Sequence, residues 1–496
     1  MKLQNILGIS AGYHDAAATV IRSDGEILFA GHSERYSKLK NDANISDGLL
    51  SELCRWQYDT VAFYERPWLH NLQQLYSGQR ELGPWTTRGA LKQYLGAWYQ
   101  TPAANEHSYP HHLSHAAAGF QTSPFNRATV VVIDAIGEFD TITIYGAHYD
   151  NGKARYHKLW GQRYPHSIGL FYSAITQRIG LRPLDEEYIT MGMSAYGNKQ
   201  FSQQLINKEL VDSVTDMRFK QNLHIGLGSE VFNGYSNEDI AAGAQAVVEE
   251  LIYSVMQRAK DFGWSRNLVY QGGVALNCLA NRNLGDYFEN IWIMPCPGDA
   301  GGSLGAAALA YGGRIKWNNA YLGRDISGDY PVDAVIDCLF RDKIVGVASG
   351  RAEFGPRALG NRSLLADPRG EDIKDRVNEI KRRQKFRPFA PVILEEYANE
   401  YFDMPCGWSD SRYMQIVGRC RSPKLFPAIT HVDGTSRIQT VPADGSGIRK
   451  LLDAWYAHTG CPMLLNTSLN IRGEPVVNDR ADADRFEQLY GVKVCS

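Results

Sequence analysis

The sequence lacks the features of a disulfide-bonded, secreted or membrane-spanning protein. Its eight cysteines are scattered, and no two of them stand at the C-x-x-C spacing of a zinc knuckle or a redox pair. No run of about eighteen apolar residues occurs, so no transmembrane helix and no membrane association are predicted. His14 and Asp15 interrupt the apolar stretch near the start of the chain, which argues against a signal peptide. These absences favour an enzyme that keeps its thiols reduced in the cytoplasm.

The chain also lacks a strong net charge. Lys and Arg number 52 and Asp and Glu 54, which gives a formal net charge of −2. This balance argues against a large nonspecific nucleic-acid surface, although local basic patches remain compatible with it. Neither a Walker loop nor a dinucleotide-binding fingerprint is present. With 496 residues, of which 44% are hydrophobic, the chain is long enough for two or three domains.

Two segments of similar pattern indicate a duplicated fold. Residues 6–35 alternate strand, turn and strand, and the same succession begins again at residue 128. Two such units predict halves that face each other across a cleft. Residues 239–262 have the periodicity of an amphipathic helix.

The last third of the chain differs from what precedes it. The polar, irregular stretch 313–334 is the expected domain boundary, and residues 335–496 alternate short apolar strands with helices. This pattern predicts a second α/β domain. By contrast, residues 45–110 have a helical, aromatic pattern and contain no recognisable group of catalytic or metal-binding residues.

Four residues form a candidate metal site. His111 and His115 are four positions apart, so on a helix their rings share one face and can converge on an ion. Asp134 ends an apolar strand, and Asp299 precedes a helix in P-G-D-A-G-G. The simpler alternatives are histidines that line a helix, a turn-initiating Asp134 and a helix-capping Asp299. Two imidazoles and two carboxylates together would suit iron(II), manganese or zinc.

Three glycine-rich turns are candidates for a nucleotide cleft. G-I-S-A-G-Y-H-D, G-G-V-A-L-N and G-D-A-G-G-S-L-G each allow backbone N–H groups to approach a phosphate. The second contains Gly272, Gly273 and Asn277, and the first carries His14, which can donate or accept a proton near neutral pH. Taken singly, each is also explained as a tight structural turn.

A basic segment follows in the last third. Residues 351–390 contain eleven Lys or Arg against six Asp or Glu. The cations lie among glycines and apolar residues, where they need anionic partners, and arginine matches phosphate bidentately. Structural salt bridges are the alternative for some of them. We therefore expect an anion site, with polyphosphate as the favoured ligand.

The motifs together resemble those of the NodU/CmcH-type O-carbamoyltransferases over nearly the whole chain. G-x-x-x-x-H-D-A-A-A, H-H-L-S-H-A, M-G-M-S-A-Y-G, G-G-V-A-L-N-C-x-x-N, E-F-G-P-R-A-L-G-N-R-S, F-R-P-F-A-P and L-L-N-T-S-L-N occur in the family's order. The resemblance implies an α/β protein with two domains. Residues 1–330 would form a duplicated actin/Hsp70-like ATPase-fold domain that transfers carbamoyl, and residues 335–496 a YrdC-like domain that forms carbamoyl-adenylate.

The resemblance also implies a two-step reaction. The C-terminal domain would join carbamoyl phosphate and ATP, bound with Mg, into carbamoyl-adenylate, and the N-terminal domain would transfer the carbamoyl group to a hydroxyl. Iron(II) is the metal implied for the four ligands, and His14 would assist the transfer. The residues carried over for the anion site are Lys381, Arg387 and Ser468 as catalytic groups, with Arg357, Arg437 and Asn466 as neighbours.

Alternatives concern the acceptor and the activity itself. A sugar or natural-product hydroxyl is the leading acceptor, with a nucleotide or nucleic acid as the second. A non-catalytic ATP-binding regulator and a sugar kinase are the remaining hypotheses, and a homo-oligomer is compatible with all of them. The sequence departs from the family in Met191-Gly192-Met193-Ser194-Ala195-Tyr196-Gly197, which has lost the family's proline, and in a short C-terminus.

Overall fold

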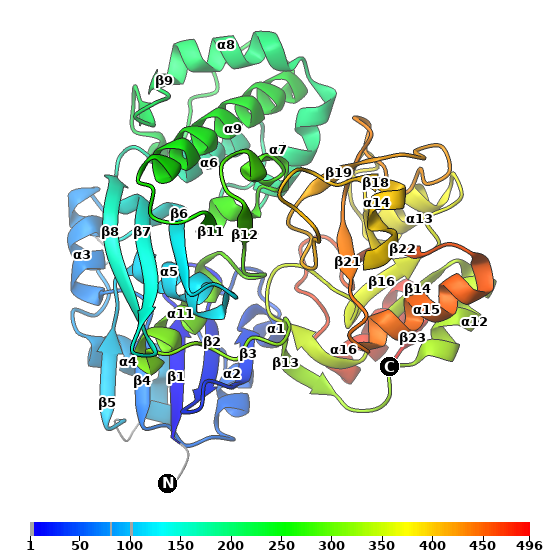
Figure 1. Cartoon of the computed structure of the whole chain (residues 1–496), viewed down its shortest axis with the longest axis horizontal. Helices are drawn as coiled ribbons and strands as arrows, with labels where there is room; N and C mark the ends of the chain where they lie inside the picture. Colours follow the sequence, from blue (N-terminus) through cyan, green and yellow to red (C-terminus); the bar gives the residue numbers. More distant parts are fainter. Residues whose placement is uncertain (1–3, 80–81, 100–102) are drawn as a thin grey trace. The chain divides into compact units, whose positions relative to one another are not determined.

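The computed structural model describes residues 4–79, 82–99 and 103–496 (Figure 1). The chain divides into two compact units. Unit 1 comprises residues up to Ser37, Asn41–Ala280 and Leu284–Asn318, and unit 2 comprises Lys38–Lys40, Asn281–Asn283 and Asn319–Ser496. The division at residues 318 and 319 falls inside the polar stretch expected to be a boundary. The functions assigned to residues 1–330 and 335–496 stay predictions.

Unit 1 contains two five-stranded sheets of the same topology. The first has the order β3-β2-β1-β4-β5 and the second the order β8-β7-β6-β11-β12. In each sheet the first three strands in sequence form an antiparallel meander, and the last two add in parallel beside its first strand. The duplicated α/β architecture predicted for the N-terminal part is therefore confirmed. The strands are β1 (Asn5–Ser10), β2 (Ala17–Arg22), β3 (Ile27–His32), β4 (Thr60–Phe63), β5 (Asn105–Ser108), β6 (Arg127–Gly137), β7 (Asp140–Asp150), β8 (Lys153–Arg163), β11 (Asn267–Gln271) and β12 (Asn290–Trp292).

Two helices form the layer between these sheets. α11 (Asp299–Tyr311) packs on β1, α5 (His111–Thr122) packs on β6 and β11, and the two helices pack against each other (Figure 1). Small residues allow this close approach. A Cβ placed on Gly8 of β1 would lie 2.0 Å from the Ser303 carbonyl oxygen, and one on Gly119 of α5 would lie 2.6 Å from the Val269 side chain. The ends of α5, β6 and α11 thereby come together.

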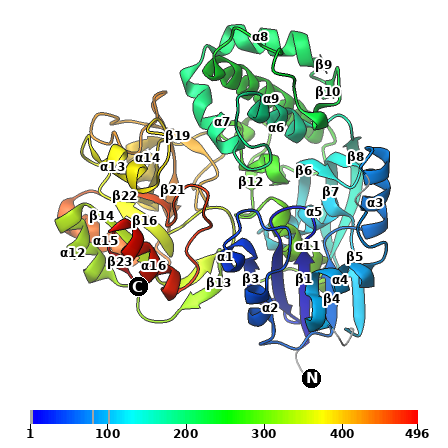
Figure 2. The ribbon, with the colours of Figure 1, turned by 180° about the vertical axis from the view of Figure 1, so that it is seen from behind.

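The other elements of unit 1 are shorter or lie outside these layers. The predicted amphipathic helix is confirmed as α9, and α6 packs beside it and against β6 (Figure 2). The helices are α1 (Glu34–Ser37), α2 (Asp47–Leu53), α3 (Pro67–Tyr76), α4 (Thr87–Leu95), α6 (Ile168–Arg178), α7 (Glu187–Met193), α8 (Lys199–Leu210), α9 (Asn237–Asp261) and α10 (Cys278–Asn281), and the small hairpin is β9 (Val211–Ser213) with β10 (Arg218–Phe219). None of the helices in the described residues combines the length and apolar composition needed to cross a bilayer.

Gly305→Ala is expected to destabilise unit 1 by about 1–3 kcal/mol or more, because overpacked side chains must displace their neighbours. A Cβ at Gly305 of α11 would lie 1.8 Å from the Ser114 carbonyl oxygen of α5. Denaturant unfolding measures the effect. Gly192→Ala is the matched control, because this helical glycine has nothing within 4 Å of an added Cβ. Equal unfolding free energies for the two variants would contradict the close α5–α11 contact.

Unit 2 is built on a mixed six-stranded sheet with the order β21-β17-β22-β16-β14-β23. Successive residues of its central strands face opposite sides: Ile344 and Leu364 pack with α13 and α16, whereas Val345 and Leu365 pack with α12 and α15. The result is a second α/β layered unit, as predicted. Its elements are β13 (Tyr321–Ile326), α12 (Val332–Asp342), β14 (Ile344–Ala348), β15 (Gly350–Glu353), β16 (Arg362–Ala366), α13 (Ile373–Ile380), β17 (Ala390–Leu394), α14 (Ala398–Tyr401), β18 (Phe402–Asp403), β19 (Val417–Cys420), β20 (Thr435–Arg437), β21 (Gln439–Val441), α15 (Gly447–Thr459), β22 (Met463–Ser468), α16 (Arg480–Tyr490) and β23 (Val494–Cys495).

Candidate metal and anion sites

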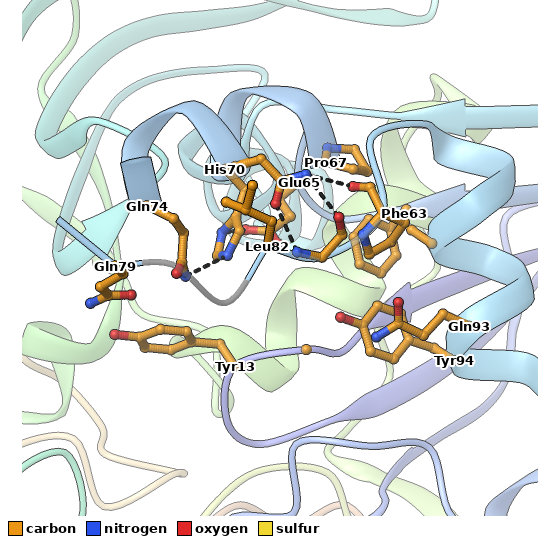
Figure 3. A pocket seen from close by; sticks show the side chains of 15 residues that line it. Tyr13, Phe63, Glu65, Pro67, His70, Gln74, Gln79, Leu82, Gln93 and Tyr94 are labelled. Carbon is orange, nitrogen blue, oxygen red and sulfur yellow. Dashed lines mark hydrogen bonds and ion pairs between the residues drawn. The ribbon is translucent and has the colours of Figure 1, made fainter. Parts of the chain in front are cut away.

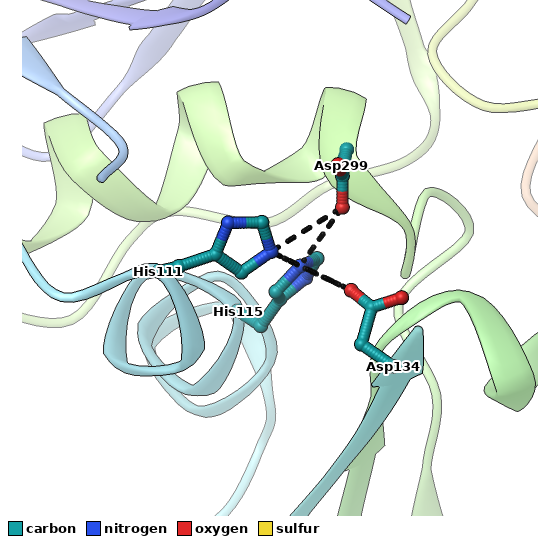
Figure 4. A group of neighbouring side chains, drawn as sticks. All are labelled: His111, His115, Asp134 and Asp299. Atoms are coloured by element: carbon teal, nitrogen blue, oxygen red, sulfur yellow. Dashed lines mark hydrogen bonds and ion pairs between the residues drawn. The ribbon is translucent and has the colours of Figure 1, made fainter. Parts of the chain in front are cut away.

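The four predicted metal ligands meet in unit 1 where α5, β6 and α11 come together. His111 begins α5, His115 lies one turn further on, Asp134 lies on β6 and Asp299 begins α11 (Figure 4). One ligand atom from each residue lies within 4.8 Å of the other three. All four side chains are buried. The structure thus gathers residues that are up to 188 positions apart in the sequence, from His111 to Asp299.

The ligand atoms converge on one point. His115 Nε2 lies 3.0 Å from His111 Nε2, 3.1 Å from Asp134 Oδ2 and 3.3 Å from Asp299 Oδ1. His111 Nε2 lies 3.5 Å from Asp134 Oδ2 and 3.4 Å from Asp299 Oδ1. Asp134 Oδ2 is buried without a hydrogen bond of good geometry. Two ring nitrogens and two carboxylate oxygens aimed at one another in this way fit a divalent cation.

The electrostatics of the cluster also fit a cation. Burial lowers the pKa of His111, but Asp299 and Asp134 outweigh it and hold that pKa well above the usual range. Burial raises the pKa of Asp134, but His111 and His115 outweigh it and hold that pKa well below the usual range. The two carboxylates thus favour positive charge beside them, and without a metal the two histidines supply it as bound protons. A divalent cation would replace those protons, because a histidine must be neutral to act as a ligand.

Glu65 lies behind the cluster and was not identified from the sequence. It follows β4, is 7% exposed, and its Oε2 lies 3.7 Å from His111 Nδ1 and 3.3 Å from His70 Nδ1. Carboxylates in this position orient a histidine ligand and raise its basicity. Residues 45–110, in which the sequence showed no constellation, thus supply a group next to the candidate metal site. The neighbouring His112 is buried and bonded to Thr143 Oγ1 at 2.9 Å, away from the ligand set.

Glu65→Gln is expected to lower metal affinity about 10- to 100-fold, the usual effect of losing a carboxylate behind a histidine ligand. The amide keeps the shape of the side chain but loses the charge facing His111. Metal titration in competition with a chelator measures the change. Glu138→Gln is the control, because this buried carboxylate accepts a hydrogen bond from Arg66 N at 2.7 Å instead. Unchanged affinity in the Glu65 variant would show that Glu65 does not support the ligand.

His14 lies at the edge of the cluster. Its Nε2 is 3.6 Å from Asp299 Oδ2 and its Nδ1 is 3.1 Å from Asp15 Oδ2. Burial lowers its pKa, but the Asp299 and Asp15 carboxylates outweigh this and raise it to about 9. The imidazole is 26% exposed, so it borders both the cluster and open space. The structure therefore places the predicted transfer residue beside the predicted ligands.

The turn at the end of β11 places its two glycines beside the His-Asp cluster, whereas its asparagine is bonded elsewhere. Gly272 has a φ of +90°, and a Cβ there would lie 2.1 Å from the Ile133 carbonyl oxygen, so only glycine fits. Gly273 N donates to Asp134 Oδ1 at 3.4 Å, which places the turn against the cluster. Asn277 is instead joined to Gln245 by two side-chain hydrogen bonds of 3.0 and 3.1 Å. The proposed nucleotide contact of Asn277 stays a prediction, and the structure shows a packing role.

In unit 2 the structure brings Lys381 and Ser468 together. Lys381 is 4% exposed, and its Nζ donates to Ser468 Oγ at 3.2 Å and to the carbonyl oxygen and Oδ1 of Asn470, each at 2.9 Å. None of these acceptors is a carboxylate. Burial, together with the nearby cations Arg383 and Arg387, holds the pKa of Lys381 well below its usual range. A group of cations this close together favours a bound anion.

Asn466 connects the other predicted members of the anion site. It lies two positions before Ser468 on β22, so both side chains point to the same face of the strand. Its Nδ2 donates to the Ala358 carbonyl oxygen at 3.1 Å and to Gln439 Oε1 at 2.7 Å. Arg357 directly precedes Ala358, and Arg437 lies two residues before Gln439. These hydrogen bonds therefore hold the backbone segments that carry the two arginines. Both arginines are half-buried.

Arg362, the most buried cation of the basic segment, has a structural role. It is 0% exposed, and its guanidinium donates to several backbone carbonyl oxygens. These belong to Arg324, Ser349, Gly350, Asn361 and Asn478, at 2.9–3.2 Å. Arg362, one of the cations counted in the basic segment, therefore links backbone segments of unit 2 and has a structural role.

Comparison with known proteins identifies the family. Residues 90–308 match the carbamoyltransferase N-terminus and residues 336–494 the carbamoyltransferase C-terminus. An uncharacterized protein of Synechocystis sp. is 32% identical over 97% of this chain and 94% of its own length. The nodulation protein NolNO of Sinorhizobium fredii is 30% identical over 95% of this chain and 76% of its own. The 3'-hydroxymethylcephem-O-carbamoyltransferase of Amycolatopsis lactamdurans is 36% identical over 45% of this chain and 46% of its own. The two matched regions and the extent of these likenesses show that this chain belongs to the carbamoyltransferase family.

Proposed function

We propose that the chain is an ATP-dependent O-carbamoyltransferase with one partial reaction in each unit. Unit 2 would form carbamoyl-adenylate from carbamoyl phosphate and ATP, with release of phosphate and pyrophosphate. Unit 1 would transfer the carbamoyl group to an acceptor hydroxyl, with release of AMP. The observation that carries this proposal is the presence of two chemically different clusters, a cationic one around Lys381 and a His-Asp one around His115.

The cationic cluster suits the first step. Carbamoyl phosphate and ATP are both strongly anionic, so Lys381, Arg383 and Arg387 would offset their mutual repulsion. Lys381 is fixed by its hydrogen bonds to Ser468 and Asn470, so its amino group is held in place before the substrates bind, and a bound anion would favour its charged form. Arg357 and Arg437, held near Asn466, would contact the phosphates, and Mg would accompany the ATP.

The His-Asp cluster suits the second step. His111, His115, Asp134 and Asp299 would hold the metal, and iron(II) is the ion we favour among those that fit two nitrogen and two oxygen ligands. When bound, the ion supplies a positive charge that can stabilise the nucleotide phosphate as it leaves. His14 would help to position the reacting carbamoyl group, since it lies beside Asp299 and is partly exposed. Gly272 and Gly273 keep the backbone close to Asp134.

The acceptor we favour is the hydroxyl of a small molecule such as a sugar or a natural product. A nucleotide or nucleic-acid acceptor is the second candidate, and the formal charge of −2 disfavours it for long nucleic acids. Membership of an enzyme family disfavours the non-catalytic ATP-binding regulator. The relative from Amycolatopsis lactamdurans carries the name of an O-carbamoyltransferase, which supports a hydroxyl acceptor.

The test is a transfer assay with labelled carbamoyl phosphate and ATP. Sugars, nucleosides and nucleic acid are offered as acceptors, and pyrophosphate release is followed in the same samples. We expect pyrophosphate release that requires carbamoyl phosphate and label in a small hydroxylated acceptor. ADP in place of AMP would indicate a kinase, and tight ATP binding without pyrophosphate release would indicate a regulator.

A further inference from the structure

A cavity of about 630 Å³ lies in unit 1 beside the His-Asp cluster. Its volume falls in the range of small-molecule sites. Side chains from four segments line it, among them Tyr13, Glu65, His70, Gln74, Gln93 and Tyr94 (Figure 3). The lining combines amides and aromatic rings, and no lysine or arginine is among the described lining residues.

Helix α3 has its polar side turned toward this cavity. His70, Asn71 and Gln74 line the cavity, whereas four large apolar side chains of the same helix are exposed. Those exposed side chains are Trp68 (46%), Leu72 (41%), Leu75 (49%) and Tyr76 (70%). A helix that packs on an apolar core turns its apolar side inward. This reversed orientation of α3 indicates that the cavity accommodates a polar ligand.

A chain of side chains connects the cavity to the metal ligands. Glu65 Oε2 lies between His111 Nδ1 (3.7 Å) and His70 Nδ1 (3.3 Å), and His70 Nε2 lies 2.9 Å from Gln74 Nε2. The amide of Gln74 can only donate in this contact, so Nε2 accepts and Nδ1 carries the proton that faces Glu65. His70 thus has its lone pair on Nε2, where the Gln74 amide donates to it at 2.9 Å. A hydroxyl group in the cavity reaches this lone pair by taking the place of the Gln74 amide.

Tyr13 places the cavity beside the proposed transfer centre. Its ring centroid is 6.5 Å from that of His70 and 5.3 Å from that of His14. His14 Nε2 is in turn 3.6 Å from Asp299 Oδ2. A molecule in the cavity would therefore lie within a few ångströms of the groups that handle the carbamoyl donor.

We propose that this cavity binds the acceptor, an uncharged polyhydroxylated molecule such as a neutral sugar, and that His70, held by Glu65, accepts the proton of the attacking hydroxyl. The inference rests on the proposed function. An uncharged acceptor fits because the carboxylate of Glu65 is already shared by two histidines. The amides of Gln74 and Gln93 suit hydroxyl groups, and the tyrosine rings suit the apolar face of a sugar.

The step balances without a further reactant. The acceptor hydroxyl replaces the Gln74 amide at His70 Nε2. Its oxygen then forms a bond to the carbamoyl carbon, and its proton moves to His70 Nε2. The bond between that carbon and the phosphate oxygen breaks, and the electron pair leaves with AMP. Glu65 stabilises the imidazolium that results, as a carboxylate does behind a catalytic histidine.

Several groups around His70 affect its charge. Burial lowers its pKa, but Glu65 outweighs burial, and the net shift is upward. From the other elements, His111 on α5 opposes protonation, whereas Glu138, at the end of β6, favours it. Burial raises the pKa of Glu138 itself to about 7. Tyr13 faces the ring from the loop after β1.

The test compares His70→Gln with Leu72→Ala, a control on the exposed side of α3. Acceptors are methyl glucoside and methyl N-acetylglucosaminide as neutral probes, glucosamine as a cation and glucose 6-phosphate as an anion. The unaltered enzyme should carbamoylate the neutral probes best. His70→Gln should lower kcat for transfer about 10²- to 10⁴-fold, the range for a lost general base. It should also remove the fall in transfer rate at low pH and leave pyrophosphate release unchanged.

A second variant keeps the inference falsifiable if His70→Gln folds poorly. Gln93→Ala, at the exposed rim of the cavity, should raise KM for the neutral probe severalfold with little change in kcat. Pyrophosphate release with transfer to the charged probes alone, or to no probe, would overturn the inference but not the proposed function. Unaltered transfer in both variants would also overturn it. Absence of pyrophosphate release from the unaltered enzyme would instead overturn the proposed function.

Discussion

His115→Ala should remove the bound metal and lower carbamoyl transfer to an acceptor at least about 100-fold, while pyrophosphate release stays near that of the unaltered enzyme. His115 Nε2 lies within 3.3 Å of both aspartate oxygens and 3.0 Å from His111 Nε2, so its loss takes away one of four converging ligands. A metal that stabilises a leaving phosphate supplies several kcal/mol, and each 1.36 kcal/mol changes the rate about tenfold. Metal analysis and the two partial-reaction assays measure the outcome.

His112→Asn is the matched control for this prediction. His112 is on the same helix and equally buried, but it bonds Thr143 Oγ1, and asparagine can keep that hydrogen bond. The control should retain the metal and transfer activity. If His115→Ala kept full metal content, or lost both partial reactions equally, the assignment of the cluster to metal binding and transfer would be wrong.

Arg387→Ala should have the reverse effect, with pyrophosphate release lowered about 10²- to 10³-fold and the metal retained. Arg387 is close enough to lower the pKa of Lys381, so both cations belong to one cluster. A charge-assisted hydrogen bond contributes about 1.5–3 kcal/mol, and a guanidinium that holds a phosphate through two of them loses both on truncation. Steady-state pyrophosphate release with saturating carbamoyl phosphate and ATP measures the effect.

Lys385→Ala is the control within the same segment. Lys385 is 66% exposed, and its partner Glu379 is 3.4 Å away and equally exposed, so an ion pair there contributes little. Pyrophosphate release should stay within about twofold of the unaltered enzyme. If Arg387→Ala and Lys385→Ala reduced release to the same extent, general charge in the basic segment, and not a defined anion site, would explain the result.

The parts of the account that the sequence predicted depend on local spacing. The distance between His111 and His115 is fixed by one helical turn. Asp134 directly follows the apolar run of β6, although the strand continues to Gly137, and Asp299 begins α11. The repeated strand-turn-strand pattern predicted the duplicated sheets, because antiparallel neighbours joined by short turns leave a local signal. The anion site expected from the cations of the basic segment and their glycine and apolar neighbours stays a prediction.

The parts that were missed depend on tertiary contacts. In the sequence Glu65 is an acid that follows a strand, and acids are common at that position, so it gave no signal. Only the fold brings it to His111 and His70. The helix α3 exposes four of its large apolar side chains, and only the fold shows that its polar side lines the cavity. The nucleotide contact of Asn277 stays a prediction, and nothing in the sequence indicated that Gln245, 32 positions away, would bond both the oxygen and the nitrogen of its amide.

The most direct test of the central claim, that two chemically distinct sites share the two partial reactions, is made on one sample of the full chain. Phenanthroline removes transition metals and leaves Mg with ATP, after which pyrophosphate release and acceptor carbamoylation are measured together. We predict that release persists, that carbamoylation is lost, and that iron(II) restores it. Loss of both activities on chelation, or persistence of both, would contradict the account.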